Sequence, residues 1–185
     1  MRDAVGHFWG IVGTRPYMRA RLGLAQCLHE MGQADEAIGH YQELLRLNPN
    51  DNQGVRDILL PLYLATGRDQ EAGDLLGRYA DDASAIWKYG WALWTFRREG
   101  DSPAARNRLH DAIKTNRHVS GYLTGKTRMP EVMPVSYALG SPDEAVLCAD
   151  ELAEAWRATP GADRWLLTSG PKRKTGAPKG RRRSG

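Results

Sequence analysis

Cysteine is scarce in this 185-residue sequence. Its two cysteines, Cys27 and Cys148, lie far apart and neither belongs to a CxxC pair. We interpret both as small buried residues rather than as a disulfide or a redox pair.

Long apolar runs are also missing. No stretch approaches the roughly 20 apolar residues needed to span a bilayer. The N-terminus, MRDAVGHFWGIVGTRP, lacks the apolar segment and the small-residue cleavage site of a signal peptide. We therefore expect a soluble, cytoplasmic protein without a membrane anchor.

Catalytic motifs are absent as well. The five histidines form no HExxH motif and no pair at i and i+4 suited to zinc. The sequence has no GxxxxGK[ST] or GxSxG motif, and no segment alternates like a β-strand. Asp81 and Asp82 could form a carboxylate pair, but they are better explained as the start of a helix. We predict no enzyme activity, no cofactor and no metal site, and a hydrolytic or metal-dependent enzyme is the least favoured hypothesis.

Positive charge is concentrated at the C-terminus. Residues 171–185, PKRKTGAPKGRRRSG, hold seven Lys or Arg and no acid, which leaves 19 basic and 22 acidic residues and a net charge of −3 elsewhere. We predict that residues 169–185 are a disordered basic tail, because they carry no apolar residue larger than Ala. A solubilising tail is the simpler interpretation. The alternative is a protein that contacts nucleic acid or an acidic membrane through the tail. The residues predicted to contact nucleic acid are Lys172, Arg173, Lys174, Arg181, Arg182 and Arg183.

The sequence repeats itself with a period of about 34 residues. The segment RLGLAQCLHEMGQADEAIGHYQELLRLNP at 21–49 is matched 68 residues later, and a middle copy with one inserted residue lies between them. A period of 34 with this internal order is the spacing of tetratricopeptide repeats. The recurring positions include Gly32, Gly67 and Gly100, then Ala37, Ala72 and Ala105, then Tyr41, Leu76 and Leu109.

Each recurring position has a physical role in a helical hairpin. Leu24 and Leu28 are spaced to form the inward stripe of a first helix. The glycines end that helix, where a left-handed conformation costs them least. The alanines are small because the second helix crosses the first closely, and the residues in register with Tyr41 are its large core side chains.

The polar segment NPNDN at 48–52 lies where one helix must end and another begin. Pro49 cannot continue the preceding helix, and Asp51 or Asn50 can cap the next one. A calcium loop would need several carboxylates at alternate positions, and only Asp51 and Asp57 are available. We interpret the segment as a corner between helices.

Residues 18–117 therefore resemble three tetratricopeptide repeats. More narrowly, TRPYMRARLGLAQCLHE, LNPNDNQGVRDILL and NRHVSGYLTGKTRMP with GSPDEAVLCADELAEAWRATPGADRWL are similar to the C-terminal repeat region of the suppressor of tumorigenicity seven family and its bacterial relatives. The similarity runs from about His7 to Leu167. It implies an all-α repeat protein that acts as a scaffold and has no established catalytic residues.

The predicted fold class is an all-α, tetratricopeptide-like α-α superhelix, a solenoid of helical hairpins with a C-terminal helical cap and a disordered basic tail. We divide the chain into an N-terminal aromatic segment (1–17), three repeats (18–117), the cap (118–168) and the tail (169–185). Ser141, Pro142 and Glu144 predict a capping box at the start of a long helix in the cap. Pro61 is expected to kink the first helix of the middle repeat.

The first helices of such repeats line a concave groove. Arginines beside Trp and Tyr on those helices suit recognition of carboxylates and apolar anchors. We therefore predict a non-catalytic scaffold that binds an acidic or C-terminal peptide of a partner protein, and formation of a homo-oligomer stays open. The indole stripe of Trp87, Trp91 and Trp94 could equally be core. The predicted partner-binding residues are Arg19, Arg56, Tyr63, Trp94 and Arg97.

Overall fold

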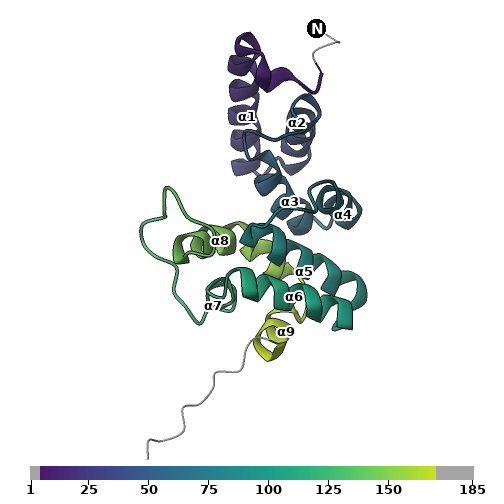
Figure 1. Cartoon of the computed structure of the whole chain (residues 1–185), viewed down its shortest axis with the longest axis vertical. Helices are drawn as coiled ribbons and strands as arrows, with labels where there is room; N and C mark the ends of the chain where they lie inside the picture. Colours follow the sequence, from purple (N-terminus) through teal and green to yellow (C-terminus); the bar gives the residue numbers. More distant parts are fainter. Residues whose placement is uncertain (1–4, 170–185) are drawn as a thin grey trace, which may run out of the picture.

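The structure is a computed structural model that describes residues 5–169 (Figure 1). All regular elements in this range are helical, which confirms the predicted all-α class. Two 3-10 turns, η2 (Phe8–Gly10) and η3 (Val12–Thr14), come first. The α-helices are α1 (Arg15–Glu30), α2 (Ala34–Leu47), α3 (Val55–Ala65), α4 (Asp69–Arg78), α5 (Ala85–Glu99), α6 (Pro103–Thr115), α7 (Val119–Leu123), α8 (Pro142–Ala158) and α9 (Ala162–Ser169). The predicted basic tail lies outside the described residues, except that Ser169 ends α9.

Three helical hairpins follow one another along the chain: α1 with α2, α3 with α4, and α5 with α6 (Figure 1). Each hairpin turns at a glycine with positive φ, which is 75° at Gly32, 73° at Gly67 and 65° at Gly100. Side chains with a Cβ rarely adopt this conformation. The recurring glycines therefore end the first helix of each hairpin, as the repeat predicts.

The recurring small and large positions form the core between paired helices. Ala37, Ala72 and Ala105 are completely buried, so the helices of each hairpin approach closely at these positions. The side chains of Tyr41, Leu76 and Leu109 are at most 1% exposed. The inward packing of the second helices is thus as the sequence predicts.

Two positions on α1 depart from the predicted core. Leu24 is 49% exposed and Cys27 is also exposed, whereas the sequence predicts that both are buried. Both side chains are therefore open to solvent within residues 5–169. Cys148, in contrast, is buried as expected.

Asp51 forms the corner between α2 and α3. Its Oδ1 accepts a hydrogen bond from the Val55 backbone N–H at 2.8 Å, and its Oδ2 accepts one from the Arg56 N–H at 2.9 Å. Two amides at the start of α3 that have no partner within the helix are thereby satisfied. Asp51, rather than Asn50, is the capping residue, and α3 continues through Pro61 without ending there.

The C-terminal part does more than cover the last repeat. Helix α8 packs against α7 and also against α3 and α5, the first helices of the second and third hairpins (Figure 1). It therefore lies along the side of the solenoid that the first helices form. Helix α9 contacts α6, α7 and α8, and the Trp165 indole stacks on Phe96 and Trp156 at centroid distances of 4.4 and 6.3 Å.

Glu144 fixes the start of α8 to the solenoid. As predicted, the Ser141 hydroxyl caps α8 by accepting a hydrogen bond from the Glu144 N–H at 3.1 Å. The Glu144 carboxylate, however, does not close the capping box on Ser141. It accepts hydrogen bonds from the backbone N–H groups of Ala85 and Gly140 and from the Asn116 side-chain amide. This buried carboxylate therefore joins α8 to the start of α5 and the end of α6.

Candidate functional site

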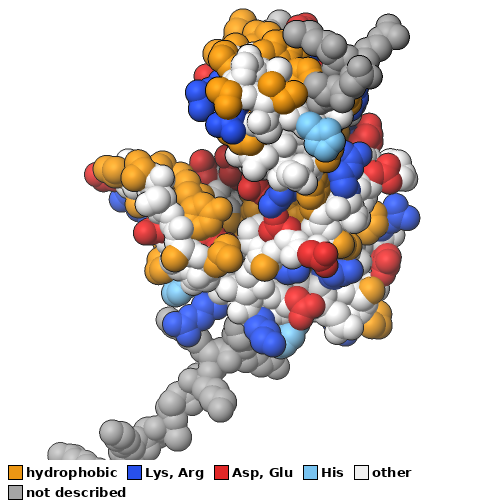
Figure 2. All heavy atoms as spheres, turned by 45° about the horizontal axis from the view of Figure 1, so that its top comes forward, with side chains coloured by type: hydrophobic (Ala, Val, Ile, Leu, Met, Phe, Trp, Pro, Cys, Tyr) orange, Lys and Arg blue, Asp and Glu red, His pale blue; other side chains and the backbone are white. Residues whose placement is uncertain are grey.

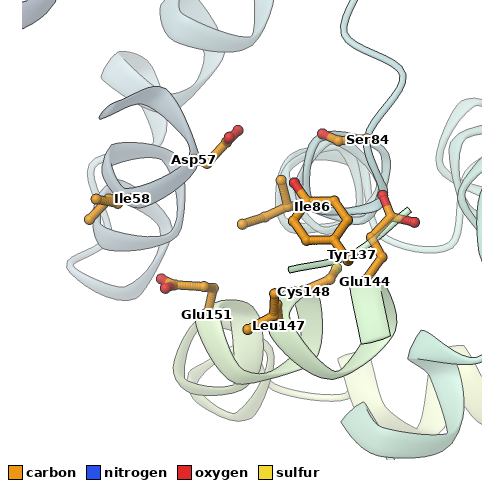
Figure 3. Close-up of a pocket in the computed structure, with 9 residues that line it drawn as sticks. All are labelled: Asp57, Ile58, Ser84, Ile86, Tyr137, Glu144, Leu147, Cys148 and Glu151. Carbon is orange, nitrogen blue, oxygen red and sulfur yellow. The ribbon is translucent and has the colours of Figure 1, made fainter. Parts of the chain in front are cut away.

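A recess lies where α3, α5 and α8 meet, beside the loop that leads into α8 (Figure 3). This cavity, which we call the recess throughout, has a volume of about 230 Å³. The lining residues are Asp57 and Ile58 from α3, Ser84 at the start of α5, Ile86 from α5, Tyr137 from the loop, and Glu144, Leu147, Cys148 and Glu151 from α8.

The walls of the recess are largely apolar. Ile58, Ile86 and Leu147 line it from three different helices, and Ile86 points into it from α5 (Figure 3). Burial raises the pKa of the Cys148 thiol well above its usual value, so this side chain stays protonated and acts as a small apolar group. The walls can therefore hold an aliphatic or aromatic group.

Besides the hydrogen-bonded Glu144, two carboxyl groups line the recess from opposite helices, Asp57 from α3 and Glu151 from α8 (Figure 3). Burial raises the pKa of Asp57 to about 6; the charges of Asp82 and Asp51 raise it too, whereas Arg56 lowers it. The Asp57 Oδ1 is a buried atom without a hydrogen-bond partner. The recess thus contains an acid whose negative charge is incompletely compensated.

The second acid, Glu151, is exposed as a residue, yet the surrounding helices still desolvate its carboxyl group. This desolvation raises its pKa to about 7, with further contributions from the negative charges of Asp150 and Asp57. The acids of the two helices therefore repel each other when both are ionised.

The acidic character extends toward α1. Burial raises the pKa of Tyr41 to about 12, and the charges of Glu151 and Glu30 raise it further. Glu30 at the end of α1 and Glu151 on α8 therefore both lie near Tyr41. Figure 2 shows acidic side chains gathered in the hollow between the N-terminal hairpin and the arched loop before α8.

Arg56 and Tyr63, two of the predicted partner-binding residues, contact other parts of the same chain. The Arg56 guanidinium pairs with Asp82 at 2.7 Å and lies over the rings of Tyr79 and Trp87. Tyr63 is 4% exposed, and its hydroxyl accepts a hydrogen bond from the Gln42 side chain at 2.9 Å. Tyr63 therefore faces α2, away from α8.

Of the remaining three predicted residues, Trp94 and Arg97 both contact Asp69 at the start of α4, and Arg19 lies apart from them on α1. The Trp94 indole N–H donates to the Asp69 carbonyl at 2.7 Å, and Arg97 pairs with the Asp69 carboxylate at 3.3 Å. Arg19 is exposed, with its guanidinium 5.9 Å from the centre of the Trp9 ring. None of the five predicted residues lines the recess. Their partner-binding role stays a prediction.

The stripe of tryptophans is divided by the fold. Trp87 is completely buried, whereas Trp91 and Trp94 are half-buried and stack under Arg108 and Arg98. The core interpretation therefore holds for Trp87. The recess itself was missed because its acids come from helices far apart in the sequence, and no local pattern joins Asp57 to Glu151.

Comparison with known proteins agrees with this geometry over the first hairpin. A family model described as a tetratricopeptide repeat matches residues 19–51, which contain most of α1 and all of α2. Residues 19–51 form a tetratricopeptide repeat. The paired hairpins that follow are consistent with a tetratricopeptide-like fold. Searches of curated proteins and of solved structures gave no match.

Two further features bear on function. Within residues 5–169, no group of His, Cys, Asp and Glu side chains is arranged to hold a metal ion. In the same range, no helix is both long and apolar enough to cross a membrane. Tetratricopeptide repeats usually bind proteins and are usually non-catalytic, so the matched repeat indicates a protein-interaction role in general.

Proposed function

We propose that this chain is a non-catalytic scaffold that binds a segment of a partner protein on the side formed by the first helices of its hairpins. The observation that carries the proposal is the placement of α8. This helix covers much of α3 and α5, yet a recess with apolar walls and two carboxyl groups remains between them. The segment would bind at this recess and extend toward α1.

The chemistry of the recess differs from that of the groove predicted from the sequence. An acidic peptide was expected because of the arginines, but Arg56 and Arg97 already pair with Asp82 and Asp69. The carboxyl groups of Asp57 and Glu151 instead favour a ligand with apolar and positively charged groups. Arg19 is exposed on α1 and remains a candidate contact where the bound segment would reach that helix.

The resemblance to the suppressor of tumorigenicity seven family supports the same general role, since that family is regarded as one of scaffolds. This narrower relationship, and the nucleic-acid alternative through the basic tail, are likewise proposals. The tail lies outside the described residues, so only its seven basic residues favour the alternative.

A peptide-display selection on the full chain tests the proposal. We expect selected peptides to bind the unmodified chain and to lose binding to Leu147→Arg, which places a bulky cation in the recess. Leu139→Arg is the matched control, because Leu139 is 65% exposed and does not line the recess. Thermal unfolding of both variants establishes that they are folded. Peptides that bind both variants as well as the unmodified chain would place the binding site elsewhere.

A further inference from the structure

The recess has the size to hold a single long side chain. Its volume of about 230 Å³ is below the roughly 300–1,000 Å³ typical of pockets for small molecules. A lysine or arginine combines an aliphatic stem with a charged end. Ile58, Ile86 and Leu147 can cover such a stem, and Asp57 and Glu151 can pair with the charge.

Some exposed acids elsewhere in the described part of the chain already have arginine partners. Asp35 pairs with Arg68 at 2.6 Å and Asp101 with Arg106 at 2.6 Å. Within residues 5–169, Glu30 and Glu151 have no such ion pair. Asp57 lies 4.0 Å from Arg56, whose guanidinium is closer to Asp82. Asp57 and Glu151 in the recess, and Glu30 at the end of α1, are therefore available to a further cation.

The chain carries a segment with the complementary charge. Residues 171–185 contain seven Lys or Arg and no acid, whereas the rest of the chain has a net charge of −3. The acids of the recess and the Lys and Arg side chains of the segment therefore carry opposite charges within one molecule.

The segment also begins close enough to reach the recess. Helix α9 ends at Ser169 and packs on α8, where Trp165 stacks on Trp156. Glu151 lies little more than one helical turn before Trp156 on the same helix. Residues 170–183 can extend over roughly 45 Å, whereas the whole of α8 is only about 25 Å long. The basic segment is therefore long enough to reach the recess.

We infer that the recess is a docking site for Lys- and Arg-bearing polypeptide and that residues 171–183 of the same chain are its occupant. The inference rests on the proposed function, because it names the ligand chemistry of the same site. The basic segment then competes with any partner segment for Asp57 and Glu151, so a partner must displace it.

Carbodiimide crosslinking of the full chain tests this inference, because it joins a lysine to a carboxylate only when the two are in contact. We expect mass spectrometry to find links from Lys172, Lys174 or Lys179 to Asp57, Glu151 or Glu30. Lys88, Lys114 and Lys126 report the background. The double variant Asp57→Asn/Glu151→Gln should lose most of the link to Glu30 as well, because the segment no longer docks.

The matched control is Glu36→Gln/Asp111→Asn, which removes two exposed acids from α2 and α6 and should leave the links unchanged. Links spread evenly over the surface, or a Glu30 link that is retained in the double variant, would overturn the inference. An equal mixture of isotope-labelled and unlabelled chain separates links within one chain from links between chains. Links found only between chains would overturn the assignment to the same chain.

The peptide-display assay distinguishes the two proposals. In a full-length tail-neutral variant, whose seven Lys and Arg in 171–185 are replaced by Gln, displayed peptides should bind more tightly because the competitor is gone. Equal binding to both chains would overturn the inference and leave the proposed function in place. Binding that Leu147→Arg does not affect would contradict the proposed function itself.

Discussion

The Glu144 carboxylate and the Asn116 side-chain amide lie 3.0 Å apart in the interior, so the start of α8 is held at the end of α6. The same carboxylate accepts the Ala85 N–H at 2.9 Å, at the first residue of α5. This one buried side chain therefore positions α8, and with it one wall of the recess.

Replacing Glu144 should destabilise the whole chain. Glu144→Gln puts an amide donor among three donors and leaves at least one of them unsatisfied, which costs about 1–3 kcal/mol. For a chain of this size, each kcal/mol lowers the midpoint of thermal unfolding by about 2–4 °C. Glu154→Gln, at an exposed position on α8, is the control and should leave the midpoint nearly unchanged. Equal midpoints for the two variants would show that Glu144 does not anchor α8.

The helix corner at Asp51 gives a second stability prediction. Asp51→Ala removes the two hydrogen bonds at the start of α3 and should cost about 1–2 kcal/mol of unfolding free energy. Asn50→Ala changes the exposed neighbour and should cost little. Chemical denaturation of both variants measures the difference. A larger loss for Asn50→Ala would reassign the cap.

Two substitutions at Tyr41 separate the contribution of its aromatic ring to stability from that of its hydroxyl group. Tyr41→Ala removes a completely buried ring and should cost about 3–5 kcal/mol, by analogy with other large aromatic truncations. The Tyr41 hydroxyl is buried without a hydrogen-bond partner, so Tyr41→Phe should be neutral or stabilising. Denaturant unfolding of both variants checks this, and a marked loss in Tyr41→Phe would reveal a partner for the hydroxyl.

The predicted partner-binding arginines should differ in their effect on stability. Arg56→Ala and Arg97→Ala break ion pairs with Asp82 and Asp69, and we expect each to lower the unfolding free energy by about 1–3 kcal/mol. Arg19→Ala changes an exposed side chain and should stay within about 0.5 kcal/mol. Thermal unfolding of the three variants compares them. No loss in Arg56→Ala or Arg97→Ala would favour a binding role for these residues.

Stability should fall as the pH rises from about 5 to 7. Asp57 and Glu151 have pKa values of about 6 and about 7 in the folded chain, against ordinary values of 3.8 and 4.5. Over this range the folded state therefore binds more protons than the unfolded state, and ionisation disfavours folding. The groups near Asp57 are Arg56, Asp51, Asp82, Tyr137 and Glu151, and those near Glu151 are Asp150, Asp57, Tyr41 and Glu30.

Unfolding midpoints of the tail-neutral variant at pH 5, 6 and 7 measure this slope without competition from the basic segment. Adding Asp57→Asn/Glu151→Gln should flatten it. An unchanged slope in the combined variant would assign the dependence to other groups. Asp101 affects the pH dependence of stability only at lower pH, because its hydrogen bond with Arg106 lowers its pKa to about 2.

The sequence by itself determined the hairpins of this protein. Gly32, Ala37 and Tyr41 meet partners within one repeat, so the backbone conformation and side-chain size at each position depend on neighbours close in the chain. Asp51 could likewise be predicted, since a helix cap needs only the residues just after it.

Only the tertiary structure decided where α8 lies and that a recess remains between α8, α3 and α5. The sequence predicted its start at Ser141, but an amphipathic helix does not specify which surface covers its apolar stripe. The hydrogen bonds of Glu144 to Ala85 and Asn116 settle that choice across a long stretch of chain. The packing of Tyr63 toward α2 is likewise a tertiary contact, and the recess at Asp57 and Glu151 exists only because distant helices meet there.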